Sequence, residues 1–138
     1  MEKGHAESTV RTKEENIDPR TLATFSKHTF PQILAMQAKR WGKKRVAIRE
    51  KAYGIWEPYT WHDYLQYVKH VALGLLSLGL ERGERVGIIM DNHAEWLFSE
   101  LGAQSVGAST LNLYTSSVTK ELTFGLNRIQ AAYVVAQD

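Results

Sequence analysis

The feature that most constrains the fold is the run VGIIM at residues 86–90, which is apolar without alternating polar positions. A strand with one solvated face alternates, whereas a strand covered on both faces reads as a continuous apolar run. Asp91, Asn92 and His93 follow directly, and the next residues have helical spacing. This order predicts a buried parallel strand whose carboxyl end meets a polar corner, where α/β proteins place their ligands.

Segments with clear periodicity surround this strand. The clearest helix is predicted over 60–78, with Thr60 as its N-cap. Gly79 then takes the left-handed position after the last turn. Upstream, Thr29 and Gln32 form a capping box for a helix that Gly42 ends. The other predicted elements are a hairpin over 46–59, helices over 93–106 and 118–128, and strands over 110–113 and 133–136. The order predicts an α/β fold, with a mostly parallel sheet and helices on both faces, preceded by a helix and a β-hairpin.

Composition narrows the class of protein. The 138 residues include no cysteine, which excludes disulfides and thiolate metal sites and favours a cytoplasmic location. A net charge of +2 gives no general affinity for nucleic acid, and no apolar run approaches the roughly 20 residues of a membrane span. Residues 1–21 are polar and contain no aromatic side chain, which predicts a disordered leader before an ordered domain over 22–138.

The polar corner after the apolar strand has a structural and a functional interpretation. Asn92 and Glu95 have the spacing of a capping box, so a role for Asn92 as N-cap is favoured over ligand contact. At His93 the helix dipole disfavours the protonated imidazole, which is one way to obtain a neutral catalytic donor. No serine, second histidine or carboxylate pair accompanies His93 at a motif spacing, so a surface histidine in the first turn is favoured.

Three other motifs do not complete a site. Tyr114–Ser117 resembles the start of a phosphate-binding loop but lacks glycine and lysine, so Ser117 is expected to be the N-cap of the next helix. The glycines of Gly83–Gly87 precede a strand, whereas a dinucleotide fingerprint follows one. No zinc-binding spacing connects the histidines, which are His5, His28, His62, His70 and His93. Residue chemistry alone therefore predicts a scaffold with no catalytic, cofactor-binding or metal-binding residue.

A basic cluster surrounds Trp41. Its cations are Lys39, Arg40, Lys43, Lys44, Arg45, Arg49 and Lys51. A solvated helix end is the favoured interpretation, and the alternative is peripheral contact with an anionic membrane surface through Lys39, Arg40, Lys43, Lys44 and Arg45. Nucleic acid is not expected as a partner, because no recognition helix or stacking motif accompanies the charges.

Several short segments together resemble the AMP-forming acyl-CoA synthetases, and within them the long-chain fatty acyl-CoA ligases. These segments are Tyr59-Thr60-Trp61, 74–80, 83–86, Asn92 followed by Glu95-Trp96, Gly107-Ala108, Tyr114, Leu126-Asn127 and Val134-Val135. Upstream, Thr29-Phe30-Pro31, Trp41 and Val46-Ala47-Ile48 also fit. Their order and spacing make the resemblance specific, rather than any one motif.

The resemblance implies an activity for a complete ligase. Such enzymes use ATP and Mg²⁺ to convert a fatty acid into an acyl-adenylate and then transfer the acyl group to coenzyme A. The family's phosphate-binding loop and catalytic lysine have no counterpart within 1–138, which implies an incomplete portion of a larger N-terminal domain, inactive alone and without a cofactor of its own. A stand-alone α/β binding module and a truncated non-catalytic relic are the alternatives. The helices predicted from the sequence are too few to cover both faces of the sheet, so the segment alone is expected to be marginal, self-associating or stabilised by a partner.

The last part of the chain departs from the family pattern. Val118, Thr119 and Lys120 stand where the family has proline and acids at a helix start. A polar-Gly turn is replaced by 128–130, and an acid by Gln137. These changes indicate a relaxed or divergent copy, or a relative from a thinly sampled branch.

Overall fold

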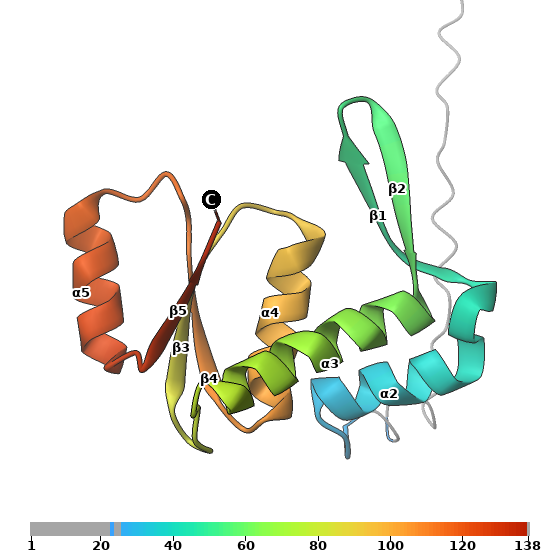
Figure 1. Cartoon of the computed structure of the whole chain (residues 1–138), viewed down its shortest axis with the longest axis horizontal. Coiled ribbons are helices and arrows are strands. Elements are labelled where there is room, and N and C mark those ends of the chain that lie inside the picture. The colour runs from blue at the N-terminus through green and yellow to red at the C-terminus, as the bar shows by residue number, and fades with distance from the viewer. Residues whose placement is uncertain (1–22, 24–25, 138) are drawn as a thin grey trace, which may run out of the picture.

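The computed structural model describes residue 23 and residues 26–137, so the leader predicted over 1–21 lies outside the described part of the chain. The elements in chain order are α2 (Phe30–Trp41), η1 (Gly42–Lys44), β1 (Val46–Ala52), β2 (Ile55–Thr60), α3 (Trp61–Ser77), β3 (Arg85–Ile89), α4 (Ala94–Ser105), β4 (Ser109–Leu113), α5 (Thr119–Ile129) and β5 (Tyr133–Ala136). Figure 1 shows β3, β4 and β5 between α5 and α4, with the β1–β2 hairpin at the other end. The predicted order of helices and strands is confirmed.

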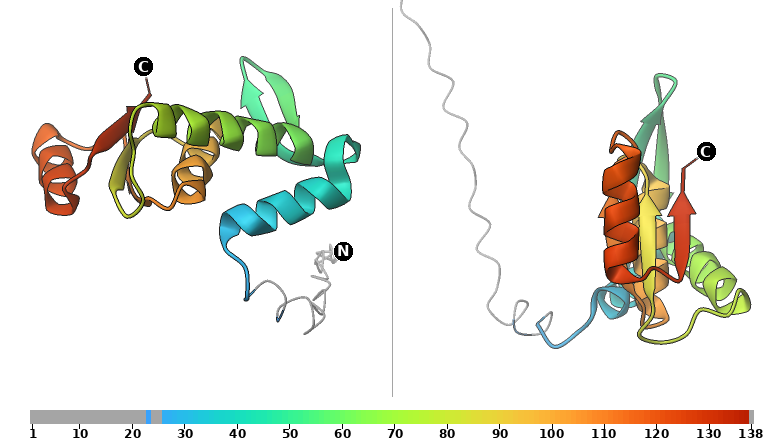
Figure 2. Two further views of the ribbon diagram at one scale, coloured as in Figure 1. Left: turned by 60° about the horizontal axis from the view of Figure 1, so that its bottom comes forward. Right: turned by 90° about the vertical axis from the view of Figure 1, so that its left-hand side faces the viewer.

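The three-stranded sheet is parallel and has the order β4-β3-β5. In the central strand Val86 and Ile88 are fully buried against α3 and α4, where they pack in one cluster with Leu75 and Ala103. Gly87 faces the opposite side, and a Cβ atom there would lie only 2.3 Å from Leu126 Cδ2 of α5. Helices therefore cover both faces of the sheet, as Figures 1 and 2 show and as the continuous apolar run predicts.

A second cluster joins the three helices α2, α3 and α4. Its buried members are Leu34, Tyr64, Val68, Ala94 and Phe98. The chains of α3 and α4 approach closely at Gly102, where an added Cβ would lie 2.5 Å from Val71 Cγ1. Val71 packs against both clusters, so α3 connects the sheet to the N-terminal helix.

The β1–β2 hairpin is an antiparallel pair that extends away from the helices (Figure 2). Its two-residue turn, Tyr53-Gly54, has positive φ at both positions (50° and 83°), as a twisted two-residue hairpin requires. No described helix is both long enough and apolar enough to traverse a bilayer.

Local hydrogen bonds set the ends of α2 and α3. Gln32 Oε1 accepts from the Thr29 backbone N–H at 2.9 Å. Thr60 and Asp63 form a reciprocal capping box, and the hydrogen bonds from Thr60 lower the pKa of Asp63. Gly79 has φ 94°, as predicted for the residue after the last turn of α3.

Two predicted N-caps are wrong. His93, not Asn92, occupies the N-cap position of α4, and Val118, not Ser117, occupies that of α5. At α4 a carboxylate from β1, that of Glu50, accepts from the Ala94 backbone N–H and makes a local cap unnecessary. At α5 Ser117 belongs to the preceding turn, because its backbone N–H donates to the Tyr114 carbonyl.

Candidate functional site

The carboxyl ends of the three parallel strands meet at the polar corner predicted after β3. The Asp91 backbone N–H donates to Gln137 Oε1 at 3.0 Å, and Thr115 Oγ1 donates to Asp91 Oδ1 at 2.5 Å. Gln137 follows β5 and Thr115 follows β4, so the corner connects the loops after all three strands. Asp91 is recognisable from the sequence as the residue after the apolar strand, whereas its two partners are not, since they lie 24 and 46 residues away and no local motif links them to it.

Glu50 on β1 reaches this corner from the hairpin. Its Oε1 lies 2.5 Å from His93 Nδ1, and its Oε2 accepts from the Ala94 N–H at 3.3 Å. The hydrogen bond to Glu50, with help from nearby carboxylates, raises the pKa of His93 above its ordinary value of 6.5. The helix dipole, which is the influence visible in the local sequence, acts on this pKa in the opposite direction. The structure thus holds His93 in an ion pair at the entrance of α4, with 46% of its side chain exposed.

Glu95 completes a group of possible metal ligands with Glu50 and His93. One donor atom from each residue lies within 4.8 Å of the others, and this is the one such group in the described part of the chain. Two carboxylates and an imidazole match the ligand chemistry of zinc. Both Glu50 oxygens already accept hydrogen bonds, however, and the positive end of α4 opposes a cation. As arranged, the group is a helix cap with an ion pair.

A cleft of about 550 Å³ opens beside this corner, between α3, the start of α4 and the end of β5. Its apolar wall is formed by Tyr67, Val71, Met90, Phe98 and Val135, and His93, Glu95 and Gln137 add polar groups. Tyr67 stacks on Phe98 with the ring centroids 4.7 Å apart. The cleft lies outside the carboxyl ends of parallel strands, where α/β proteins bind ligands. Its apolar wall suits a ligand with an apolar part. We call this the strand-end cleft.

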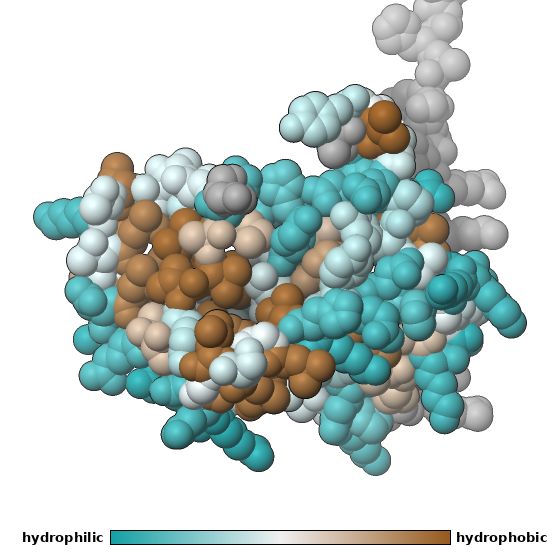
Figure 3. Space-filling view, viewed as in Figure 1, coloured by the Kyte–Doolittle hydropathy of each residue, from teal (hydrophilic) through white to brown (hydrophobic). Residues whose placement is uncertain are grey.

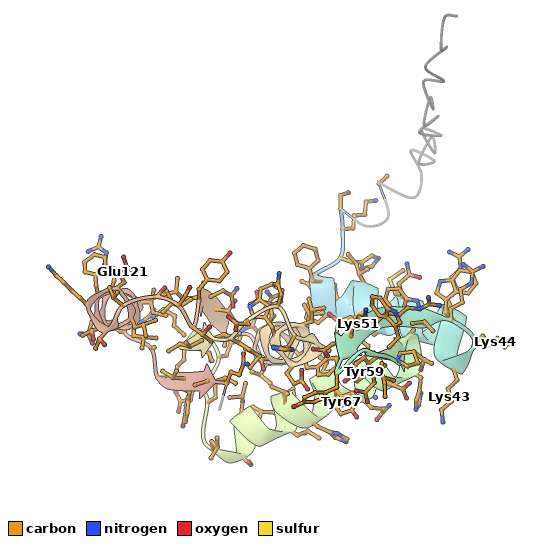
Figure 4. The ribbon with its side chains drawn as sticks, turned by 90° about the horizontal axis from the view of Figure 1, so that it is seen from above. Lys43, Lys44, Lys51, Tyr59, Tyr67 and Glu121 are labelled. Carbon is orange, nitrogen blue, oxygen red and sulfur yellow. The ribbon has the colours of Figure 1, made fainter. Side chains whose placement is uncertain are left out.

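The strand-end cleft and the hairpin beside it hold no activated nucleophile among the described residues. His93 is paired with Glu50, and no serine or threonine hydroxyl is hydrogen-bonded to it. Burial, followed by nearby carboxylates, raises the pKa of Tyr59 to about 12, so this phenol stays protonated at neutral pH. Figure 4 shows Tyr59 close to Tyr67, and their rings meet edge to face at 5.8 Å. The arrangement can bind and orient a ligand.

The loop Tyr114–Ser117 does not fit a triphosphate. It has no glycine to bring backbone amides onto phosphate oxygens, and the Ser117 N–H is already bonded to the Tyr114 carbonyl. Gly83 precedes β3 and Gly87 lies within it, so neither glycine belongs to the loop that follows the strand. Neither of these two motifs therefore has the form of a triphosphate-binding loop.

The basic cluster lies at the end of the molecule opposite α5. Figure 4 shows Lys43 and Lys44 at one extreme and Glu121 of α5 at the other. The guanidinium groups of Arg40 and Arg45 lie over the Trp41 ring, 4.7 and 3.7 Å from its centroid.

Solved structures place this architecture in one class. The chain superposes on a fatty acid AMP ligase from Legionella pneumophila with a TM-score of 0.71, at 16% identity, over 77% of this chain and 19% of that one. The Klebsiella oxytoca NpsA N-terminal subdomain gives a TM-score of 0.71 at 20% identity, over 79% of this chain and 27% of that one. The fold is therefore shared with a part of the NpsA N-terminal subdomain and with a part of the Legionella pneumophila ligase.

Sequence comparison gives the family. The pattern of the AMP-binding enzyme family matches residues 34–138, and the chain belongs to this family. Over 132 residues it is 26% identical to the long-chain-fatty-acid–CoA ligase ACSBG2 of Xenopus laevis, covering 96% of this chain and 17% of that protein. The ACSBG1 ligase of Bos taurus is 33% identical over 101 residues, which are 73% of this chain and 14% of that protein. An uncharacterized protein of Mycobacterium tuberculosis, Rv1549, is 35% identical over 56% of this chain and 45% of its own length.

The chain thus spans less than one fifth of the ligases and less than half of Rv1549. The resemblance found in the sequence is confirmed, and so is the assignment to an incomplete part of a larger α/β domain.

Proposed function

We propose that this chain forms part of the AMP-binding domain of an ATP-dependent long-chain fatty acid–CoA ligase. The observation that carries the proposal is the alignment with the frog ligase over 96% of the chain. In the complete enzyme the fatty acid carboxylate attacks the α-phosphate of ATP, releases pyrophosphate with Mg²⁺ assisting, and forms the acyl-adenylate. The coenzyme A thiol then displaces AMP and yields the thioester. We place the acyl chain in the strand-end cleft, because this cleft has an apolar wall and opens at the carboxyl ends of the parallel strands.

The uncovered edges of the sheet favour the interpretation that the chain is part of a larger domain over the interpretation that it is a stand-alone module. Both β4 and β5 are edge strands of the described sheet, whereas a stand-alone module is expected to close or cover its edges. No residue of α5 is buried, and 70% of Phe124 is exposed. Apolar side chains gather over this half of the molecule (Figure 3).

We propose further that residues 1–138 alone catalyse no adenylation, because the described residues offer no triphosphate site. ATP–pyrophosphate exchange with palmitate and Mg²⁺ should stay at background for the purified chain. Exchange activity that follows the chain through two columns would contradict this.

A chimera tests the positive part of the proposal. The aligned segment of the Xenopus laevis ligase is replaced by the matching 132 residues of this chain, and acyl-CoA formation from palmitate is measured. We expect activity within about tenfold of a matched chimera that carries the Bos taurus ACSBG1 segment. Ile88→Asp in the same chimera should abolish activity, because it buries an unpaired charge in the central strand. A folded, soluble chimera without activity, beside an active Bos taurus chimera, would favour the non-catalytic relic.

A further inference from the structure

The hairpin end of the molecule combines two features that together define an interaction surface. Its cations are the seven residues of the basic cluster, Lys39, Arg40, Lys43, Lys44, Arg45, Arg49 and Lys51, and all seven are exposed. Within residues 26–137 the one salt bridge joins Glu50 to His93, so none of these cations is in an ion pair in the part of the chain that the structure describes. The surface is therefore strongly positive although the whole chain carries a net charge of only +2.

The acidic groups near this surface weaken it little. Glu50 is occupied by His93 and the Ala94 N–H, and Asp63 by the N-cap of α3. Glu57 on β2 is exposed and is the one acid that faces solvent on the hairpin. Glu95 of α4 is also exposed and lies beside Glu50. Seven cations against two exposed carboxylates leave a surface complementary to a dense array of anions.

Apolar side chains project from the tip of the same hairpin. Tyr53 is fully exposed, Ile55 is 73% exposed and Trp56 is 60% exposed. The tyrosine occupies a turn position with φ 50°, which glycine, asparagine or aspartate adopts at lower cost. Lys51 Nζ lies 5.8 Å from the centroid of the Trp56 ring, so a cation adjoins the apolar tip.

We propose that this hairpin end docks on an anionic phospholipid membrane. Tyrosine and tryptophan prefer the interface between headgroups and acyl chains, where an amphipathic ring contacts both environments. Each lysine or arginine near an anionic bilayer adds about fivefold to binding. Shallow insertion of Tyr53, Ile55 and Trp56 supplies the apolar contribution, and Lys43, Lys44, Arg45, Arg49 and Lys51 supply the electrostatic one. The docking surface stands on the geometry of the hairpin and is independent of the proposed ligase activity.

Sedimentation with vesicles tests the electrostatic part. The full chain is mixed with vesicles of phosphatidylcholine alone or of phosphatidylcholine with phosphatidylglycerol as the anionic lipid. Binding should require the anionic lipid and should weaken as salt is raised. The double variant Lys43→Gln/Lys44→Gln should bind about 25-fold more weakly. Lys120→Gln/Arg128→Gln removes two exposed cations from α5 at the opposite end and should bind like the unaltered chain. Equal loss in both double variants would overturn the assignment of the surface.

A second pair of variants tests the hairpin tip. Tyr53→Ser/Trp56→Ser should bind at least tenfold more weakly than the unaltered chain, whereas Phe124→Ser on α5, a similarly exposed aromatic, should not change binding. Unaltered circular dichroism of each variant shows that the fold is kept. Wild-type binding by the tip variant would overturn the docking mode. Tighter binding to a single-stranded RNA oligonucleotide than to vesicles, lost in the same lysine variant, would overturn the membrane as partner.

Discussion

Glu50 connects two segments that are far apart in the sequence, because one carboxylate caps α4 and pairs with His93. Asn92, which the sequence had favoured for the same task, is exposed and is not the N-cap. We therefore expect Glu50→Ala to lower the free energy of unfolding by about 0.5–2 kcal/mol, the usual range for loss of a cap. Asn92→Ala should change it by less than about 0.5 kcal/mol. Urea unfolding at pH 6 measures both, and the reverse order would restore Asn92 as the cap.

The ion pair also makes stability depend on pH. Because the pKa of His93 is raised in the folded state, its stabilisation is complete below the unfolded value of about 6.5 and is lost as pH rises through the folded value. The melting temperature of the unaltered chain should therefore exceed that of His93→Gln most at pH 5.5–6 and approach it by about pH 9. Combining His93→Gln with Glu50→Gln should add no further pH dependence. A constant difference across this range would contradict the ion pair.

At the scale of elements, the packing of α3 on α4 depends on Gly102. An added Cβ would lie 2.5 Å from Val71 Cγ1 and 2.7 Å from Val71 Cβ, too close for any rotamer change to relieve. Gly102→Ala should destabilise the protein by about 1–3 kcal/mol. Gly74→Ala is the matched control in α3, because nothing lies within 4 Å of that position and alanine favours the helix by about 0.5–1 kcal/mol. The melting temperatures of the two variants should shift in opposite directions, downward for Gly102→Ala and upward for Gly74→Ala. An unchanged melting temperature for Gly102→Ala would mean that α3 and α4 lie farther apart at this contact.

The elements were largely predictable because their signals are local. The apolar period of α3, the Thr60 cap and Gly79 all lie within one segment, and the VGIIM run indicates two covered faces by itself. The misplaced cap of α4 has a different cause. Glu50 reaches α4 across 44 residues, so the local spacing of Asn92 and Glu95 was a misleading signal. The same reason explains why Thr115 and Gln137 at the corner were missed, whereas Asp91 was found.

For the whole molecule, the apolar surface around the sheet and the end of α3 predicts association. Leu73 is 63% exposed, Leu78 is 65% exposed and Val134 on the edge strand β5 is 47% exposed. Sedimentation velocity should show an average mass that rises with protein concentration. Leu73→Ser/Leu78→Ser should shift this rise to higher concentration, and Tyr53→Ser at the distant hairpin should not. A monodisperse monomer at every concentration would favour the stand-alone module.

The order β4-β3-β5 has a consequence for synthesis on the ribosome. The central strand β3 is made first, and its second neighbour β5 begins only at Tyr133. Because the ribosome adds about 5–20 residues per second, several seconds pass between the synthesis of β3 and that of β5. Until then β3 lacks one of its two neighbouring strands. During this interval Val86, Ile88 and Ile89 are exposed on a strand with an open edge, the kind of segment that nascent-chain chaperones recognise. Slower translation between codons 90 and 132 should therefore lower the soluble yield, and co-expression of a chaperone should restore it.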